Sequence, residues 1–294
     1  MIETGPDCLV CFMKQAKGAI ALCEQDSTIQ YELLSAVAEM ISQFPVSASP
    51  PENAARYYAY ISEQTGVTDP FSAIKHQSTA YALSREDHLR AVIMAADDPV
   101  LTAARLAIGA NVLDSGAQRQ LDIKESLKRC LYTPLAISHY QAFSEQLCTK
   151  PDILYLADNC GELVLDKILV ELLLDKGCRV TVAVRQSPVI NDATLEDARA
   201  IGLDQICPVI SNGTGIPGTV LNKTSREFRE YFDSAELIIS KGMGNFESLY
   251  GTPAPLYYLF TVKCTTVRTR IRKEFTGRNL EIGSFIFLRQ EGCL

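Results

Sequence analysis

Clusters of polar residues follow short apolar runs in the second half of the chain, and their residue types can bind cations and phosphate. The clusters are Asp158–Glu162, Asn191–Thr194, Ser211–Gly215, Lys241–Asn245 and the pair Lys263-Cys264. Asp, Asn and Gly are also common turn and helix-capping residues, so each cluster alone has an ordinary structural explanation. Their shared placement after apolar runs favours one common site.

The residue types in these clusters suit phosphate-ester chemistry better than redox chemistry. Asp158, Asn159 and Asp192 offer oxygen donors, which hard divalent cations such as Mg²⁺ or Mn²⁺ prefer. Lys241 and Lys263 supply positive charge for a phosphoryl group, and glycines beside Lys241 allow close approach of the main chain. The chain has three histidines, and all of them lie before residue 150, which disfavours a nucleophile activated by histidine at this site.

Two halves of the sequence differ in periodicity and predict how these residues are positioned. Before about residue 151 apolar residues recur at helical spacing, and one of the predicted helices spans 124–147 with a break at Pro134. From residue 152 apolar runs alternate with helical patterns, which is typical of βαβ units. The predicted strands are 153–157, 179–184, 205–210, 237–240 and 257–262, with a further edge strand at 281–288.

The predicted fold is α/β, with a doubly wound, mainly parallel sheet and an N-terminal all-helical domain. Residues 1–150 are expected to form the helical domain and residues 151–294 a Rossmann-like domain that carries the metal site. Ligands of such sheets bind beyond the carboxyl ends of the strands, where the polar clusters would converge.

Composition excludes several classes of function. The 294 residues include 28 Lys and Arg against 35 Asp and Glu, a net charge of −7, which disfavours broad binding to nucleic acid or anionic membranes. No run reaches the ~18 apolar residues of a membrane helix, and the N-terminus does not read as a signal peptide. We therefore expect a soluble, cytoplasmic protein. The glycine string 213–218 does not fit a nucleotide-binding fingerprint.

Three motifs together resemble the damage-control phosphatase family, also called acidic-residue-methyltransferase-like or domain of unknown function 89. They are Asp158-Asn159-Cys160-Gly161-Glu162, Ile190–Thr194 with Glu196-Asp197-Ala198, and Ser240–Leu249 with its Lys-Gly-Met-Gly-Asn-Phe-Glu core. The match is closest to the prokaryotic branch with an N-terminal C-x-x-C, and it covers nearly the whole chain, including Ala107–Asp114.

The resemblance implies a metal-dependent phosphatase that acts on small phosphorylated metabolites such as sugar phosphates, nucleotides or damaged phosphometabolites. Its metal (Mg²⁺, Mn²⁺, Co²⁺ or Ni²⁺) would be held by Asp158, Asn159 and Asp192. The expected mechanism is attack by a metal-activated water, with Asp158 or Asp192 as nucleophile or base as the alternative. The implied substrate-binding residues are Lys241, Gly244, Asn245, Lys263, Asn191, Glu162, Asn111 and Asp114, of which Lys263 is also counted as catalytic with the two aspartates.

Four of the ten cysteines are candidates for a function. Cys8 and Cys11 form a C-x-x-C at the head of a predicted helix, and Cys160 and Cys264 follow predicted strands. If the N-terminal segment folds over the sheet edge, the four could form a second, soft-metal or redox site. The alternative is that the latter two are small packing residues and the C-x-x-C is a reduced pair.

Two other functions remain open from the sequence. One is transfer of a methyl group from S-adenosylmethionine to a carboxylate, for which the sequence shows no dedicated nucleoside fingerprint. The other is a non-catalytic sensor of metal or phosphometabolite that uses the cysteines as a switch. Oligomeric state is not predicted by the sequence.

Overall fold

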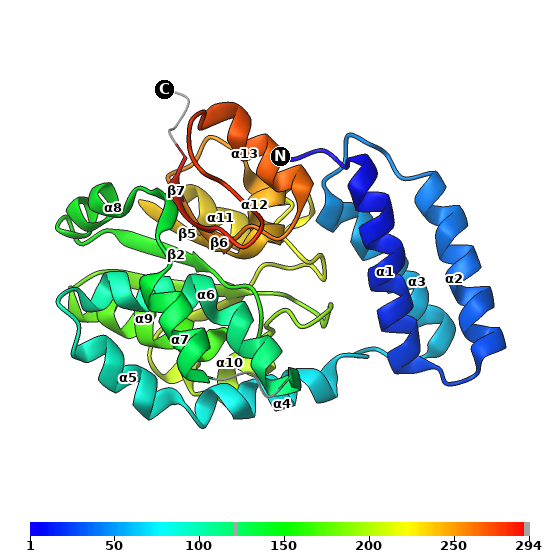
Figure 1. Cartoon of the computed structure of the whole chain (residues 1–294), viewed down its shortest axis with the longest axis horizontal. Helices are drawn as coiled ribbons and strands as arrows, with labels where there is room; N and C mark the ends of the chain where they lie inside the picture. The colour runs from blue at the N-terminus through cyan, green and yellow to red at the C-terminus, as the bar shows by residue number, and fades with distance from the viewer. Residues whose placement is uncertain (120–122, 291–294) are drawn as a thin grey trace.

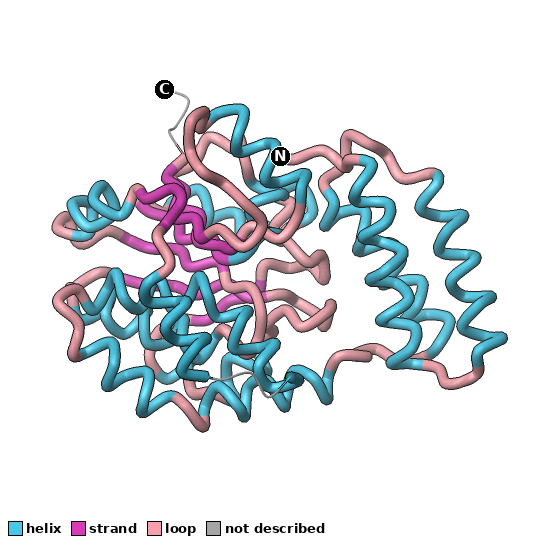
Figure 2. The backbone as a smooth tube through the Cα atoms, viewed as in Figure 1, coloured by secondary structure: helices cyan, strands magenta, loops and turns pink. Residues whose placement is uncertain are grey.

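A seven-stranded, mostly parallel sheet forms the centre of the molecule (Figures 1 and 2). The structure is a computed structural model that describes residues 1–119 and 123–290, and only the main chain of 111–119, 123, 124, 126 and 127. The strands are β1 (Leu135–Ser138), β2 (Asp152–Leu156), β3 (Arg179–Val184), β4 (Val209–Ser211), β5 (Leu237–Lys241), β6 (Leu256–Thr261) and β7 (Phe285–Arg289). Their order is β1-β7-β6-β5-β2-β3-β4, and β6 and β7 pair antiparallel. The α/β prediction is confirmed.

Successive side chains of the buried strands point to opposite faces of the sheet, and a hydrophobic core forms on each face. Leu154 and Ile238 enter one core, whereas Tyr155 and Ile239 enter the other. The parallel register pairs Leu154 with Ile238 and Tyr155 with Ile239, so side chains that share a face also stack across strands. Both faces are therefore covered, which explains why the strands read as continuous apolar runs.

Helices on the two faces follow the connections of a doubly wound fold. One core receives α9 (Leu163–Asp175) and α10 (Leu195–Ala200), together with α4 (Ser72–Leu83), α5 (Glu86–Met94), α6 (Pro99–Arg119), α7 (Ile123–Tyr132) and α8 (Tyr140–Leu147). The other core receives α11 (Arg226–Ser234), α12 (Gly242–Leu249) and α13 (Thr265–Glu274). Strand order reverses beside β2, so the loops after β2 and β5 open at the topological switch point.

A separate helical lobe stands over the strand ends, on the right of Figure 1. It consists of α1 (Pro6–Cys23), α2 (Ser27–Ser42) and α3 (Pro50–Thr65), whose own core includes Phe12, Val37 and Tyr57. Side chains of Asp26 and Ser49 cap the N-termini of α2 and α3. The proline-rich break ends at Pro50 because proline is tolerated in the first turn of a helix.

Two local predictions were correct in part: the helix is interrupted at Pro134 and a strand forms near the C-terminus, but the details differ. The helix expected over 124–147 is α7, β1 and α8, because the chain extends after Pro134 and pairs with β7. The strand expected at the edge from 281–288 is β7, which lies between β1 and β6. Both differences arise because β1 pairs with a strand about 150 residues away, a contact that local periodicity cannot reveal.

The helices before residue 150 fall into two groups. The lobe of α1–α3 has its own core, whereas α4–α8 and β1 join the sheet and its first core. Helical periodicity indicates a buried face but does not indicate which surface that face covers. In the described part of the chain no helix is both long enough and apolar enough to cross a membrane.

Candidate active site

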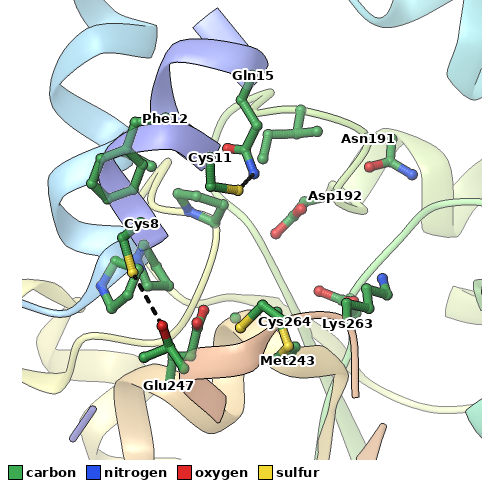
Figure 3. A pocket seen from close by; sticks show the side chains of 18 of the residues that line it. Cys8, Cys11, Phe12, Gln15, Asn191, Asp192, Met243, Glu247, Lys263 and Cys264 are labelled. Carbon is green, nitrogen blue, oxygen red and sulfur yellow. Dashed lines mark hydrogen bonds between the residues drawn. The ribbon is translucent and has the colours of Figure 1, made fainter. Parts of the chain in front are cut away.

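A cavity of about 260 Å³ lies where the helical lobe meets the carboxyl ends of the strands (Figure 3). The sheet side contributes Asp158, Asn159, Asn191, Asp192, Gly244, Glu247 and Lys263, among others. The lobe contributes Cys8, Cys11, Phe12 and Gln15 from α1 and Pro50, Pro51 and Ala54 from α3. The cavity thus joins the two parts of the chain at the position where doubly wound sheets bind ligands.

Main-chain hydrogen bonds hold together the two loops that carry the predicted metal ligands. The N–H of Ala193 donates to the carbonyl oxygen of Asp158 at 2.8 Å, and the N–H of Cys160 donates to that of Asn191 at 2.9 Å. An isolated antiparallel bridge between Asn159 and Asp192 results. Residues 33 positions apart are therefore fixed as neighbours by backbone pairing rather than by their own side chains.

Asp158 and Asp192 are two buried carboxyl groups in electrostatic contact. Burial raises the pKa of Asp158 to about 8, helped by the negative charges of Asp192 and Glu162 and opposed by Lys263 and Arg185. Burial also raises the pKa of Asp192, against the opposing effect of Arg185. Two such groups favour a bound cation, because a cation removes the repulsion that burial intensifies.

The donor set at this position fits a hard divalent cation. Asn159 donates its amide N–H to Glu162 Oε1 at 2.7 Å, so the atom it can offer to a metal is its oxygen. Asp192 accepts from Arg185 through Oδ2, which leaves Oδ1 as its second donor atom. Two carboxylates and one amide oxygen leave room for water and substrate oxygens, as Mg²⁺ and Mn²⁺ require.

Arg185 contacts this site, although it belongs to none of the polar clusters described above. The Nε of Arg185 donates to Asp192 Oδ2 at 2.7 Å, and its terminal nitrogens reach Asn245 Oδ1 at 3.1 Å and Thr219 Oγ1 at 3.3 Å. Its side chain is 2% exposed. The signal in the sequence was its position directly after the apolar strand β3, at the edge where the polar clusters converge.

Lys241 and Asn245, predicted to hold phosphate, are fully buried and do not line the cavity. The Nζ of Lys241 donates to Asp166 Oδ1 at 2.6 Å and to Glu162 Oε2 at 3.2 Å. Asn245 donates to the carbonyl oxygens of Ala157 and Lys241. Burial lowers the pKa of Lys241, but the two carboxylates outweigh it and the pKa is raised, so the lysine stays charged.

Glu162 belongs to the same buried network as Lys241. Its carboxylate bridges Lys241 and the amide of Asn159, and it is 2% exposed. It is also absent from the cavity lining. Glu162, Lys241 and Asn245 therefore contact the loops that carry the predicted metal ligands and do not line the cavity.

Lys263 and Asn191 do line the cavity, as does the main chain at Gly244. Lys263 follows β6, and its positive charge lowers the pKa of Asp158 and Asp192 and also that of Glu247. Its ammonium group thus acts on both sides of the cavity. The side chains of Asn111 and Asp114, which were also predicted to bind substrate, lie outside the described residues.

The four candidate cysteines do not all face the cavity. Cys8, Cys11 and Cys264 line the cavity, whereas the thiol of Cys160 points to the carbonyl oxygen of Lys75 at 3.7 Å. In residues 1–119 and 123–290, as far as their side chains are described, no three His, Cys, Asp or Glu side chains form a metal-binding group. Burial raises the pKa of the Cys8, Cys11 and Cys264 thiols, which opposes the thiolate that a soft metal needs.

Glu247 is a second residue to which the sequence analysis gave no role. It lines the cavity from α12 together with Met243 and Gly244, which are one helical turn before it. Burial raises its pKa to about 8, and the opposing charge is that of Lys263. Helical spacing from Gly244 was the available signal, because residues three or four apart share one face of a helix.

Comparisons with known proteins find relatives that match most of the chain. The chain is 31% identical over 270 residues to a damage-control phosphatase of Pyrococcus horikoshii, covering 90% of this chain and 93% of the relative. It is 32% identical over 242 residues to a damage-control phosphatase of Archaeoglobus fulgidus, covering 80% and 82%. An uncharacterized protein of Methanocaldococcus jannaschii is 29% identical and is covered over 96% of its length.

A solved structure and a family match extend the comparison. The crystal structure of a DUF89 family protein from Pyrococcus horikoshii superimposes with a TM-score of 0.88 at 28% identity, covering 99% of this chain and 100% of that one. Residues 4–276 match the family described as "Damage-control phosphatase ARMT1-like domain". The chain therefore belongs to the ARMT1-like (DUF89) damage-control phosphatase family.

Proposed function

We propose that this protein is a metal-dependent phosphatase that hydrolyses phosphate monoesters of small metabolites. The observation that carries the proposal is the placement of two buried carboxyl groups, Asp158 and Asp192, in one cavity with Lys263. Relatives named damage-control phosphatases support the reaction class. The cavity volume of about 260 Å³ favours a small ester over a macromolecular substrate.

The residues divide into those that hold the metal and those that meet the phosphoryl group. Asp158, Asn159 and Asp192 would hold a divalent cation, which when bound supplies Lewis-acid activation of the phosphoryl oxygen and of a water. Lys263 offers an ammonium group to the negative charge of the phosphoryl oxygens. Asn191 and the main chain at Gly244 border the same space and can orient those oxygens.

Three residues are assigned a positioning role in place of substrate contact. Glu162 holds the amide of Asn159, Lys241 holds Glu162, and Asn245 ties Arg185 to the main chain at Ala157. These contacts fix the direction of the metal-binding oxygens, which second-layer hydrogen bonds commonly do in metal sites.

A phosphatase screen with defined metals tests the proposal. The protein is treated with EDTA and assayed against a panel of sugar phosphates, nucleotides and p-nitrophenyl phosphate, with Mg²⁺, Mn²⁺, Co²⁺ or Ni²⁺ added back. Release of inorganic phosphate is expected with at least one of these metals and is expected to vanish after chelation.

The same preparation discriminates the two alternatives. Absence of turnover with every metal, together with calorimetric binding of S-adenosylmethionine, would favour a methyltransferase. Binding of a phosphometabolite without turnover would favour a sensor. Asp204→Asn, at an exposed carboxylate that does not line the cavity, serves as the control variant that keeps full activity.

A further inference from the structure

We propose that Glu247 is the general acid that protonates the leaving-group oxygen of the phosphate ester, an inference that rests on the phosphatase function proposed above. Hydrolysis of an alkyl ester produces an alkoxide unless a proton reaches that oxygen as the P–O bond breaks. A positioned acid typically contributes ~10²–10⁴-fold to such a step. Glu247 offers such a proton from the wall of the cavity.

The position of Glu247 is fixed from several directions. It is on α12, whose neighbouring residues Phe246 and Leu249 are fully buried in the core on that face. Its main-chain carbonyl oxygen accepts from the N–H of Ile2 at 2.7 Å, which ties the start of the chain to this turn of helix. Its side chain is 7% exposed and borders the cavity, so it reaches bound substrate but little bulk water.

Lys263 interacts electrostatically both with Glu247 and with two of the predicted metal ligands. The charge of Lys263 lowers the pKa of Asp158, of Asp192 and of Glu247, so the ammonium group acts electrostatically on all three. Figure 3 shows Asp192 and Glu247 on different walls of the cavity. A phosphoryl group bound beside Lys263 would lie in the cavity that Glu247 also lines, so its ester oxygen can face the Glu247 carboxyl group.

The surroundings of Glu247 favour the protonated form of its carboxyl group. The groups that interact with it electrostatically are the Cys8 and Cys11 thiols on α1, together with Lys263 and Cys264 after β6. The carboxyl groups of Asp7, Asp158 and Asp192 line the same cavity. Among the described residues no side chain or main-chain group makes a hydrogen bond to its carboxyl group. Burial raises its pKa to about 8, so the group is an acid at neutral pH.

The proposed step balances in atoms and charge. Water oxygen forms a bond to phosphorus, and the bond from phosphorus to the ester oxygen breaks with its electron pair on that oxygen. The Glu247 proton moves to the ester oxygen and yields the free alcohol. One proton of the former water then returns to the Glu247 carboxylate through solvent, and hydrogen phosphate leaves.

Leaving-group dependence tests the role. Glu247→Gln keeps the shape of the side chain but cannot donate an acidic proton. Two substrates are compared, the alkyl phosphate that the wild-type protein hydrolyses best and p-nitrophenyl phosphate, whose leaving group needs no proton. We expect kcat on the alkyl ester to fall by about 100-fold or more and kcat on p-nitrophenyl phosphate to stay within about 3-fold.

A second variant separates proton donation from general damage to the site. Lys263→Met removes charge stabilisation of the phosphoryl group and is expected to lower both rates together. Equal losses on both esters in Glu247→Gln, or no loss on either, would overturn the role of Glu247 while leaving the phosphatase function in place. Absence of turnover in the wild-type protein with every metal would instead remove the proposed function itself.

Discussion

The α carbon of Gly242 lies against the carboxylate of Asp158. A β carbon at position 242 would come within 2.0 Å of Asp158 Oδ2 and 2.2 Å of its Cγ, and the φ angle of Gly242 is +77°. Glycine is therefore required at position 242 for two reasons. The backbone there is left-handed, and the Asp158 carboxylate occupies the space that a β carbon would need. The turn between β5 and α12 thus restricts the position of the Asp158 carboxylate.

Gly242→Ala is expected to abolish phosphatase activity, because the added methyl group displaces the Asp158 carboxylate from the cavity. The matched control is Gly66→Ala, where φ is +69° and a β carbon would meet nothing within 4 Å. That control has the backbone strain alone, about 1 kcal/mol, and should retain activity. Phosphate release and urea unfolding of both variants check the difference; similar activities would contradict the steric argument.

Asp192→Ala is expected to remove metal binding and activity together. The variant loses one of two carboxylate donors and leaves Arg185 buried without its partner. Calorimetric titration of Mn²⁺ into the EDTA-treated variant should show an affinity at least about 10-fold weaker than that of the wild-type protein. Wild-type rates of hydrolysis in this variant would refute Asp192 as a metal ligand.

Arg185→Ala is expected to destabilise the fold as well as the site. The arginine is buried and paired with Asp192, and removal of one partner of a buried ion pair typically costs about 3–5 kcal/mol. Urea unfolding with and without metal measures the change in free energy of unfolding. Arg229→Ala, an exposed arginine on α11, is the control and should change stability by less than about 0.5 kcal/mol.

Lys241→Met distinguishes a positioning lysine from a substrate-binding one. The lysine is buried against Asp166 and Glu162, so its removal should lower the free energy of unfolding by about 3–5 kcal/mol. Because Lys241 does not border the cavity, KM for the phosphate ester should change much less than it does in Lys263→Met. A larger rise in KM for Lys241→Met than for Lys263→Met would restore Lys241 as a phosphate ligand.

The metal-free protein is expected to lose stability as pH rises from about 5 to 8. The pKa of Glu247 is raised from its ordinary value of 4.5 to about 8 in the folded protein. Between these values the unfolded chain releases a proton that the folded chain retains, so the free energy of unfolding falls with pH and levels off above 8. The contribution is on the order of a few kcal/mol.

Glu247→Gln isolates the part of this pH dependence that belongs to one residue. Urea unfolding of EDTA-treated protein at several pH values should show a shallower decline in the variant. Asp158, whose pKa is also raised to about 8, contributes in the same direction to both proteins and does not cancel the difference. Parallel curves for the two proteins would show that Glu247 is ionised in the folded state at neutral pH.

Much of the fold and of the cavity was predictable from the sequence. Buried parallel strands need continuous apolar runs, and such runs located the central strands β2, β3, β5 and β6 to within a few residues. Carboxyl ends of parallel strands meet at one edge of the sheet, so the sequence predicts that Asp158, Asp192 and Lys263 lie close together. The structure brings these three into one cavity.

Only the tertiary structure decided which polar residues face the cavity and which stand behind it. Lys241 and Lys263 follow neighbouring strands and look alike in sequence, yet Lys241 is turned into the core by Glu162 and Asp166, whose positions depend on α9 packing over the sheet. The roles of Arg185 and Glu247 likewise depend on contacts between distant segments. Sequence periodicity reports the burial of a position along its own element, whereas the direction of a charged side chain is set by the partners that packing brings to it.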